Sequence, residues 1–121
     1  MTSSPAVTGI AHVQLAIPPG GEERARAFYS GLLGLEEIAK PATLADRGGC
    51  WFACGPQEIH CGIEEDVAPS RRHPALLVEG LGLLQARLER HHFPTSTDRR
   101  LPGYDRFYAV DPFGNRLELF T

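Results

Sequence analysis

The 121-residue chain lacks several features that mark whole classes of protein. It has no hydrophobic run long enough to cross a bilayer, and residues 1–9 lack the apolar core of a signal peptide. Its longest basic runs are arginine pairs and its formal net charge is −3, which gives no reason to expect nucleic acid or a membrane as partner. These absences favour a soluble globular protein, and a hydrophobic content of 42% fits that class.

Cysteine is also scarce. The chain has three cysteines, an odd number, and none of them form a Cys-x-x-Cys pair: Cys50, Cys54 and Cys61. We therefore expect no disulfide framework, and we predict a cytoplasmic location, where thiols stay reduced. Cys61 is interpreted as a small buried core residue rather than as a metal ligand or a nucleophile.

What the sequence does contain is an internal repeat. The segment HVQLAI at residues 12–17 returns as HPALLV at residues 73–78, about half a chain length later. Each copy precedes a helical stretch and then strands, and each half ends in a run with a potential metal ligand, His60 or Glu118. Because repeated units fold alike, residues at matching positions can converge about a pseudo-twofold axis.

Hydrophobic periodicity predicts the pattern βαβββ in each half. In the first half we expect a strand at 9–17, a helix from 22 that is capped by Gly34, a strand and a loop within 36–47, and strands at 50–54 and 59–64. In the second half we expect a strand at 73–79, a helix at 81–92, an irregular segment at 95–101, and strands at 106–110 and 116–120 around a tight turn. The prediction is one α+β domain over residues 1–121, with module one at about 9–64, a linker at about 65–72 and module two at about 73–121.

Four potential ligands lie at matching positions, on the strand faces opposite the aliphatic residues. Three imidazoles and one carboxylate, from His12, His60, His73 and Glu118, are a donor set for a divalent ion such as Zn, Ni, Mn or Fe. Other interpretations stay open. His12 could be an ordinary strand histidine, His60 could serve as a base or a hydrogen-bond partner, and Glu118 could form an ion pair with Arg116.

Several aromatic and basic side chains are candidates for substrate contacts. Trp51 and Phe52 alternate on their strand, so one should face a cavity and the other the core. Tyr104, Arg106 and Tyr108 are predicted near the cavity rim, where they could hold an anionic or polar substrate. Their alternative role is that of ordinary surface residues.

Three motifs of the chain carry a family resemblance: GIAHV at residues 9–13, Phe-Tyr with Leu-Gly-Leu within residues 27–35, and DPFGNRLE at residues 111–118. With these motifs the chain resembles the vicinal oxygen chelate superfamily, which includes glyoxalase I, fosfomycin-resistance thiol transferases, bleomycin-sequestering proteins and extradiol dioxygenases. The resemblance covers the chain from His12 to the C-terminus. It implies two βαβββ modules that form a cupped, eight-stranded mixed sheet around a cavity, usually in a homodimer.

The resemblance also implies where a metal would bind. Its ligand positions fall on His12, His60, His73 and Glu118, and in the usual swapped dimer the first two come from one chain and the last two from its partner. His60 departs from the pattern, because glyoxalase I typically has a carboxylate there. The metal and the type of reaction therefore do not transfer directly.

We expect a metal-dependent enzyme of lyase, isomerase, transferase or dioxygenase type that acts on a small substrate through vicinal oxygens. Glu118 or His60 would serve as the catalytic proton shuttle. The main alternative is a metal-free protein that sequesters a small molecule or antibiotic, as bleomycin-resistance proteins do. A structural or regulatory interaction domain would instead have its cavity filled by side chains.

Overall fold

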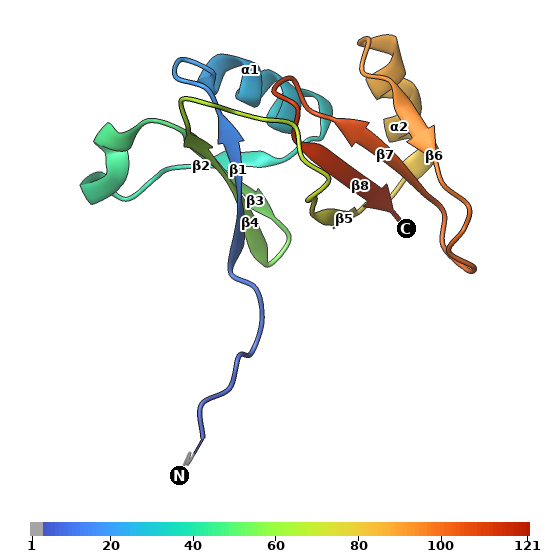
Figure 1. The fold of residues 1–121 in the computed structure, drawn as a ribbon, viewed down its shortest axis with the longest axis horizontal. Helices are drawn as coiled ribbons and strands as arrows, with labels where there is room; N and C mark the ends of the chain where they lie inside the picture. The colour runs from blue at the N-terminus through green and yellow to red at the C-terminus, as the bar shows by residue number, and fades with distance from the viewer. Residues whose placement is uncertain (1–3) are drawn as a thin grey trace.

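The computed structural model describes residues 4–121 (Figure 1). Residues 1–3, which belong to the segment expected to lack a signal peptide, lie outside the described residues. Eight strands form two four-stranded sheets, ordered β1-β4-β3-β2 and β5-β8-β7-β6. The first sheet contains β1 (His12–Ile17), β2 (Glu36–Ile38), β3 (Cys50–Cys54) and β4 (Gln57–Ile63), and the second contains β5 (Ala75–Leu77), β6 (Thr95–Thr97), β7 (Arg106–Val110) and β8 (Arg116–Phe120).

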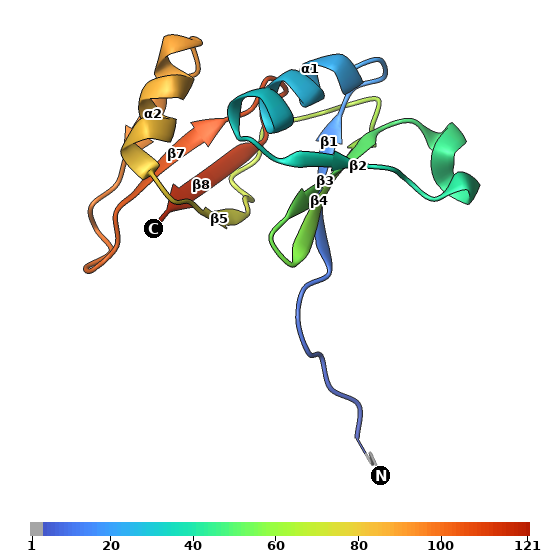
Figure 2. The ribbon, with the colours of Figure 1, turned by 180° about the vertical axis from the view of Figure 1, so that it is seen from behind.

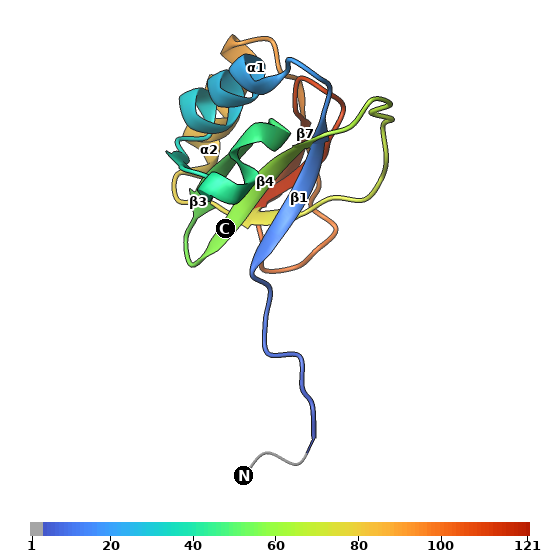
Figure 3. The ribbon, with the colours of Figure 1, turned by 90° about the vertical axis from the view of Figure 1, so that its left-hand side faces the viewer.

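The two sheets repeat one topology. The first strand of each module pairs in parallel with the last, β1 with β4 and β5 with β8, and the remaining pairs are antiparallel. Figure 3 shows β1 beside β4, with the N-terminal segment running away from the sheets. The α+β class and the two βαβββ modules are thus confirmed, with the eight strands divided between two sheets.

Each module places a helix between its first and second strands. In module one, α1 (Glu22–Arg26) continues directly into a π-helical turn, η1 (Ala27–Leu32), and ends at Gly34, whose φ of 77° is the left-handed conformation expected of a C-terminal cap. Module two contributes α2 (Leu81–Arg90), and a short 3-10 helix, η2 (Ala42–Arg47), follows β2. No helix in residues 4–121 is long and apolar enough to span a bilayer.

The core lies between these helices and one face of each sheet (Figure 2). It is continuous from one module to the other, because side chains of both helices and both sheets belong to a single apolar cluster. Its largest fully buried members are Tyr29, Phe28, Phe52, Phe107, Ile17, Leu88, Leu117 and Leu119. Because successive side chains of a strand point to opposite faces, the residues between these core positions lie on the other face of each sheet.

Several element bounds differ from the expected ones, among them β1, which begins at His12 rather than at residue 9, and two strands of the second sheet differ most. The strand expected at 73–79 is limited to β5, because Pro74 has no N–H to donate to the ladder, although its carbonyl accepts a hydrogen bond from the backbone of Glu118. The segment 95–101, expected to be irregular, begins with β6, where β-branched threonines pair with β7. Both strands lie at sheet edges, where pairing on one side leaves a weak sequence signal.

A buried turn of module two binds module one. Asp111 is only 4% exposed, and its Oδ2 accepts a hydrogen bond of 2.6 Å from the hydroxyl of Tyr29 on η1. Its Oδ1 accepts the backbone N–H groups of Phe113 and Asn115. The Asn115 amide in turn donates to the carbonyl of Ala16 on β1. The turn between β7 and β8 therefore holds the two modules together.

This contact predicts a loss of stability in alkali. Burial raises the pKa of Tyr29 well above its usual value, and the Asp111 carboxylate adds to the effect. The unfolded chain releases the proton near pH ~10 while the folded protein keeps it, so the free energy of unfolding falls above that pH. We expect the free energy of unfolding of Tyr29→Phe, measured by urea denaturation, to fall less steeply between about pH 8 and about pH 11 than that of the unchanged protein. The half-exposed Tyr104 is the control, and equal slopes for Tyr29→Phe and Tyr104→Phe would contradict the assignment.

Candidate functional site

The predicted site residues lie on the open face, defined here as the face of each sheet opposite the helices. On the first sheet it carries His12, Gln14, Trp51 and His60, and on the second Arg106, Tyr108, Arg116 and Glu118. This placement follows from strand alternation, because neighbours such as Phe52, Leu117 and Leu119 point into the core. Trp51 rather than Phe52 therefore reaches the open face.

Three rings are stacked on the open face of the first sheet. The ring centroid of His60 lies 3.8 Å from that of Trp51 and 4.0 Å from that of His12, with interplanar angles of 2° and 14°. Between these neighbours His60 is only 6% exposed. Its Nε2 donates a hydrogen bond to Oε1 of Glu58, with 2.8 Å between the two atoms. In the neutral ring Nδ1 is then the nitrogen that carries no proton and can accept a hydrogen bond.

A histidine and a carboxylate face one another at the second sheet. Nε2 of His73 lies 3.1 Å from Oε1 of Glu118, and Nδ1 of His73 lies 2.8 Å from the carbonyl oxygen of Arg71. That carbonyl has no proton to give, so Nδ1 must be the donor. In neutral His73 the lone pair of Nε2 then points at a carboxylate oxygen. Such a contact is favourable only with a proton or another cation between the two atoms.

Arg106 holds the other oxygen of Glu118. Its Nη1 donates to Oε2 at 3.0 Å, and its Nη2 lies 3.3 Å from Oδ2 of Asp98. Burial raises the pKa of Glu118, but the hydrogen bond from Arg106 and the contact with His73 outweigh this effect and lower the pKa below its usual value. Glu118 therefore stays charged near neutral pH. The alternative ion pair with Arg116 is not formed, because Arg106 on the neighbouring strand takes that place.

The sequence did not predict two residues that contact the site, and one residue that it predicted at the cavity rim is exposed in the structure. Glu58 and Asp98 were not predicted, although Glu58 lies two residues from His60 on the same strand and so on the same face. Asp98 follows β6, in the segment expected to be irregular. Tyr104, predicted at the rim, is 50% exposed and contacts Phe120 edge to face, with centroids 5.8 Å apart.

The four predicted ligands are brought together as two pairs. His12 and His60 belong to the first sheet, whereas Glu118 belongs to the second and His73 lies two residues before its strand β5. Within residues 4–121 no three or more His, Cys, Asp or Glu side chains gather closely enough to hold a metal ion. One chain therefore presents two halves of the predicted donor set.

Comparison with known proteins explains this architecture. The sequence profile of the Glyoxalase/Bleomycin resistance protein/Dioxygenase superfamily matches residues 9–119. The chain belongs to this superfamily. None of the curated proteins compared with the chain matches it. The match spans both modules of the fold.

Solved structures support the superfamily assignment. A glyoxalase family protein from Bacillus anthracis is 46% identical, with a TM-score of 0.91 and 98% of each chain covered. Lactoylglutathione lyase from Agrobacterium tumefaciens is 20% identical, with a TM-score of 0.75 over 95% of this chain and 94% of that one. The fosfomycin resistance protein FosX from Listeria monocytogenes is 16% identical, with a TM-score of 0.78 over 95% and 93%. The last two likenesses concern the fold alone.

The donor set of this superfamily member fits a divalent ion in one half better than in the other. Two ligands bound at right angles, each ~2.1 Å from an ion, are ~3.0 Å apart, and Nε2 of His73 and Oε1 of Glu118 are 3.1 Å apart. The rings of His12 and His60 are nearly parallel, so their lone pairs cannot converge on one point. One of these rings must turn before both can bind the same ion.

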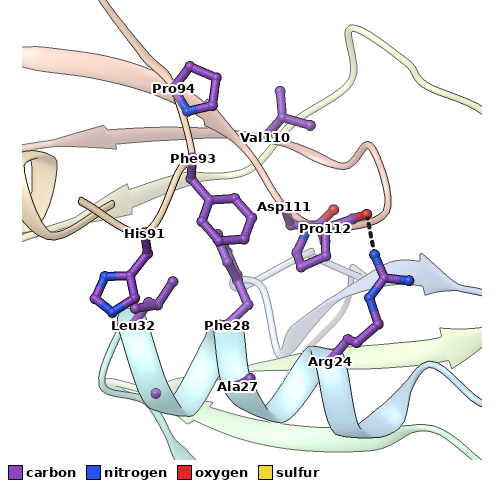
Figure 4. A pocket seen from close by; sticks show the side chains of 11 residues that line it. Arg24, Ala27, Phe28, Leu32, His91, Phe93, Pro94, Val110, Asp111 and Pro112 are labelled. Carbon is purple, nitrogen blue, oxygen red and sulfur yellow. Dashed lines mark hydrogen bonds between the residues drawn. The ribbon is translucent and has the colours of Figure 1, made fainter. Parts of the chain in front are cut away.

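A large hollow lies away from the predicted site residues. It measures about 900 Å³ and is bounded by η1, the segment after α2 and the turn after β7, with Phe28 and Phe93 in its wall (Figure 4). None of the predicted site residues lines it. A second hollow of about 730 Å³ is lined by Gln14, Arg72 and His73, between β1 and the linker. This second hollow adjoins the open face.

Proposed function

We propose that this superfamily member is a metal-dependent enzyme that acts on a small molecule through vicinal oxygens. The observation that carries the proposal is the contact of His73 with Glu118, whose Nε2 and Oε1 atoms are 3.1 Å apart, while Nδ1 of His73 lies against the carbonyl oxygen of Arg71. Members of the superfamily typically use divalent metals. An ion held by His12, His60, His73 and Glu118 would act as a Lewis acid toward the substrate oxygens.

We further propose that the site is completed in a homodimer, with His12 and His60 from one chain and His73 and Glu118 from the other. The division of the donor set between two sheets supports this arrangement. So do exposed apolar side chains at a groove of about 540 Å³ near the start of β1 and along β5. There Ile10 is 66% exposed and Leu77 is 79% exposed, which favours contact with a second copy.

In this proposal the surrounding side chains orient the reacting groups. Arg106 holds Oε2 of Glu118, which leaves Oε1 directed at His73. Glu58 accepts a hydrogen bond from Nε2 of His60, so Nδ1 of His60 is the nitrogen whose lone pair would bind the ion. A carboxylate behind an imidazole also fixes the tautomer and the orientation of the ring. We also propose a cytoplasmic location, which the absence of disulfides among residues 4–121 suits.

A second candidate function is metal-free binding of a planar small molecule. The stack of Trp51, His60 and His12 favours it, because a flat aromatic surface on the open face could continue onto an aromatic ligand. The contact of His60 with Glu58 would serve this role without any ion. The following measurement separates the two functions.

Metal binding by the chain purified without chelator tests the first function. We expect uptake of about one Mn²⁺, Ni²⁺ or Zn²⁺ per chain, with stabilisation by about 2.7 kcal/mol once the free ion is a hundred times its Kd. His73→Ala should weaken binding by at least the 10–100-fold range known for supporting residues of metal sites. His91→Ala, at the exposed end of α2, is the matched control. Uptake below about a tenth of an equivalent, without a shift in melting temperature, would favour the metal-free binder.

A further inference from the structure

Arg116 is the one open-face residue whose charge finds no partner within the described chain. None of the ion pairs among residues 4–121 includes it. Its Nε is buried and has no hydrogen-bond partner. Because no acidic side chain of residues 4–121 pairs with this guanidinium, its terminal N–H groups are suited to bind an acceptor from outside the chain.

Arg106, whose Nε is likewise buried without a hydrogen-bond partner, differs from Arg116 in how its charge is balanced. Both arginines flank the ring of Tyr108, with Cζ atoms 4.2 Å from its centroid for Arg116 and 5.7 Å for Arg106. Arg106 is balanced by the carboxylates of Glu118 and Asp98, at 3.0 Å and 3.3 Å. Arg116 has no such carboxylate, so one positive charge on this part of the open face is uncompensated.

The position of Arg116 connects it to the proposed substrate site. It lies two residues before Glu118 on the same face of β8, a spacing of roughly 7 Å along a strand. Tyr108, which contacts its guanidinium, also meets the ring of His73 edge to face at 5.4 Å between centroids. A molecule bound next to His73 and Glu118 would therefore have Arg116 within the reach of a small substrate.

We propose that Arg116 binds the carboxylate of the substrate, so that the substrate class is a small organic acid. The inference rests on the proposed function, because it uses the same face as the substrate site. Tyr108 covers one face of the guanidinium, while the N–H groups at its edge can form a two-bond fork to a planar oxyanion. A single uncompensated charge matches a carboxylate monoanion better than a phosphate dianion.

Binding of benzoate, compared with the neutral benzamide of the same shape, tests this proposal on the full chain. We expect benzoate to shift the Nε–H signal of Arg116 in ¹H–¹⁵N spectra and to bind at least about tenfold more tightly than benzamide. Arg116→Gln should remove that preference, and Arg116→Lys should restore only part of it, because lysine keeps the charge but not the fork. Arg90→Gln, the same charge change on the exposed side of α2, should leave benzoate affinity unchanged.

Three outcomes would overturn the proposal: equal affinity for benzoate and benzamide, unchanged benzoate affinity in a folded Arg116→Gln chain, or tighter binding of inorganic phosphate than of benzoate. Benzoate is titrated into the chain with and without Zn²⁺, so that a failure of the acid site can be told from a failure of the metal site. Benzoate binding that depends on Arg116 in a chain that takes up no Zn²⁺ would refute the metal site and support the acid site. If the chain binds Zn²⁺ but its benzoate affinity does not depend on Arg116, the metal site is supported and the acid site is refuted.

Discussion

Co-expression of His12→Ala and His73→Ala chains is expected to regain about one quarter of the metal sites that either variant loses alone. The reason is the proposed sharing of each site between two chains of a twofold dimer. Random pairing makes about half of the dimers mixed, and in each mixed dimer one site carries both substitutions while the other carries neither. Both side chains lie at the surface, so their removal should leave folding intact.

A second mixture provides the matched control. Chains carrying His12→Ala and His60→Ala have their substitutions in the same half of the site, so no mixed dimer regains an intact site. Metal stoichiometry from calorimetry, together with the dimer fraction from sedimentation, measures both mixtures. If the first mixture regains nothing, or if the control regains as much, the ligand set is not shared between chains.

Asp111→Ala is expected to be the most destabilising single substitution on the boundary between the modules. Its carboxylate is buried and accepts hydrogen bonds from Tyr29, Phe113 and Asn115. Truncation leaves those donors unpaired, and each hydrogen bond to a charged group contributes about 1.5–3 kcal/mol. We therefore expect a loss of at least about 3 kcal/mol in the free energy of unfolding, and a fall in melting temperature of roughly 10 °C.

Urea unfolding and thermal melting measure this effect. The exposed Asp46 provides a control, because Asp46→Ala removes the same carboxylate from a surface position and should change stability by less than about 0.5 kcal/mol. A change of similar size for Asp111→Ala would mean that the turn does not hold the modules together. A change of slope with urea would instead indicate that the modules unfold separately.

The turn at residues 111–115 illustrates how far local sequence signals reach. Asp, Pro, Gly and Asn in this order predict a tight turn, because each residue favours turn geometry on its own. The hydrogen bond between Asp111 and Tyr29 joins residues 82 positions apart. No periodicity within either segment predicts that pairing, because it depends on how two modules pack.

Glu118 is a second example. Strand alternation correctly predicted that it shares a face with Arg116, which made Arg116 the natural ion-pair partner. The partner is Arg106, because the antiparallel register places Tyr108 opposite Glu118 and brings the long side chain of Arg106 across the strands. Register between strands is a tertiary property, and it left Arg116 with the unpaired charge on which the organic-acid proposal rests.

The sequence by itself determined the order of the elements, the repeat of the βαβββ module and the strand faces on which potential ligands stand. These properties are local, since they follow from period-two alternation, turn residues and helix caps. Only the tertiary structure decided that the four potential ligands form two pairs, one in each module, and that Arg106 rather than Arg116 holds Glu118. Those outcomes depend on packing between segments far apart in the chain, where register and side-chain rotamers select among contacts that the sequence alone leaves open.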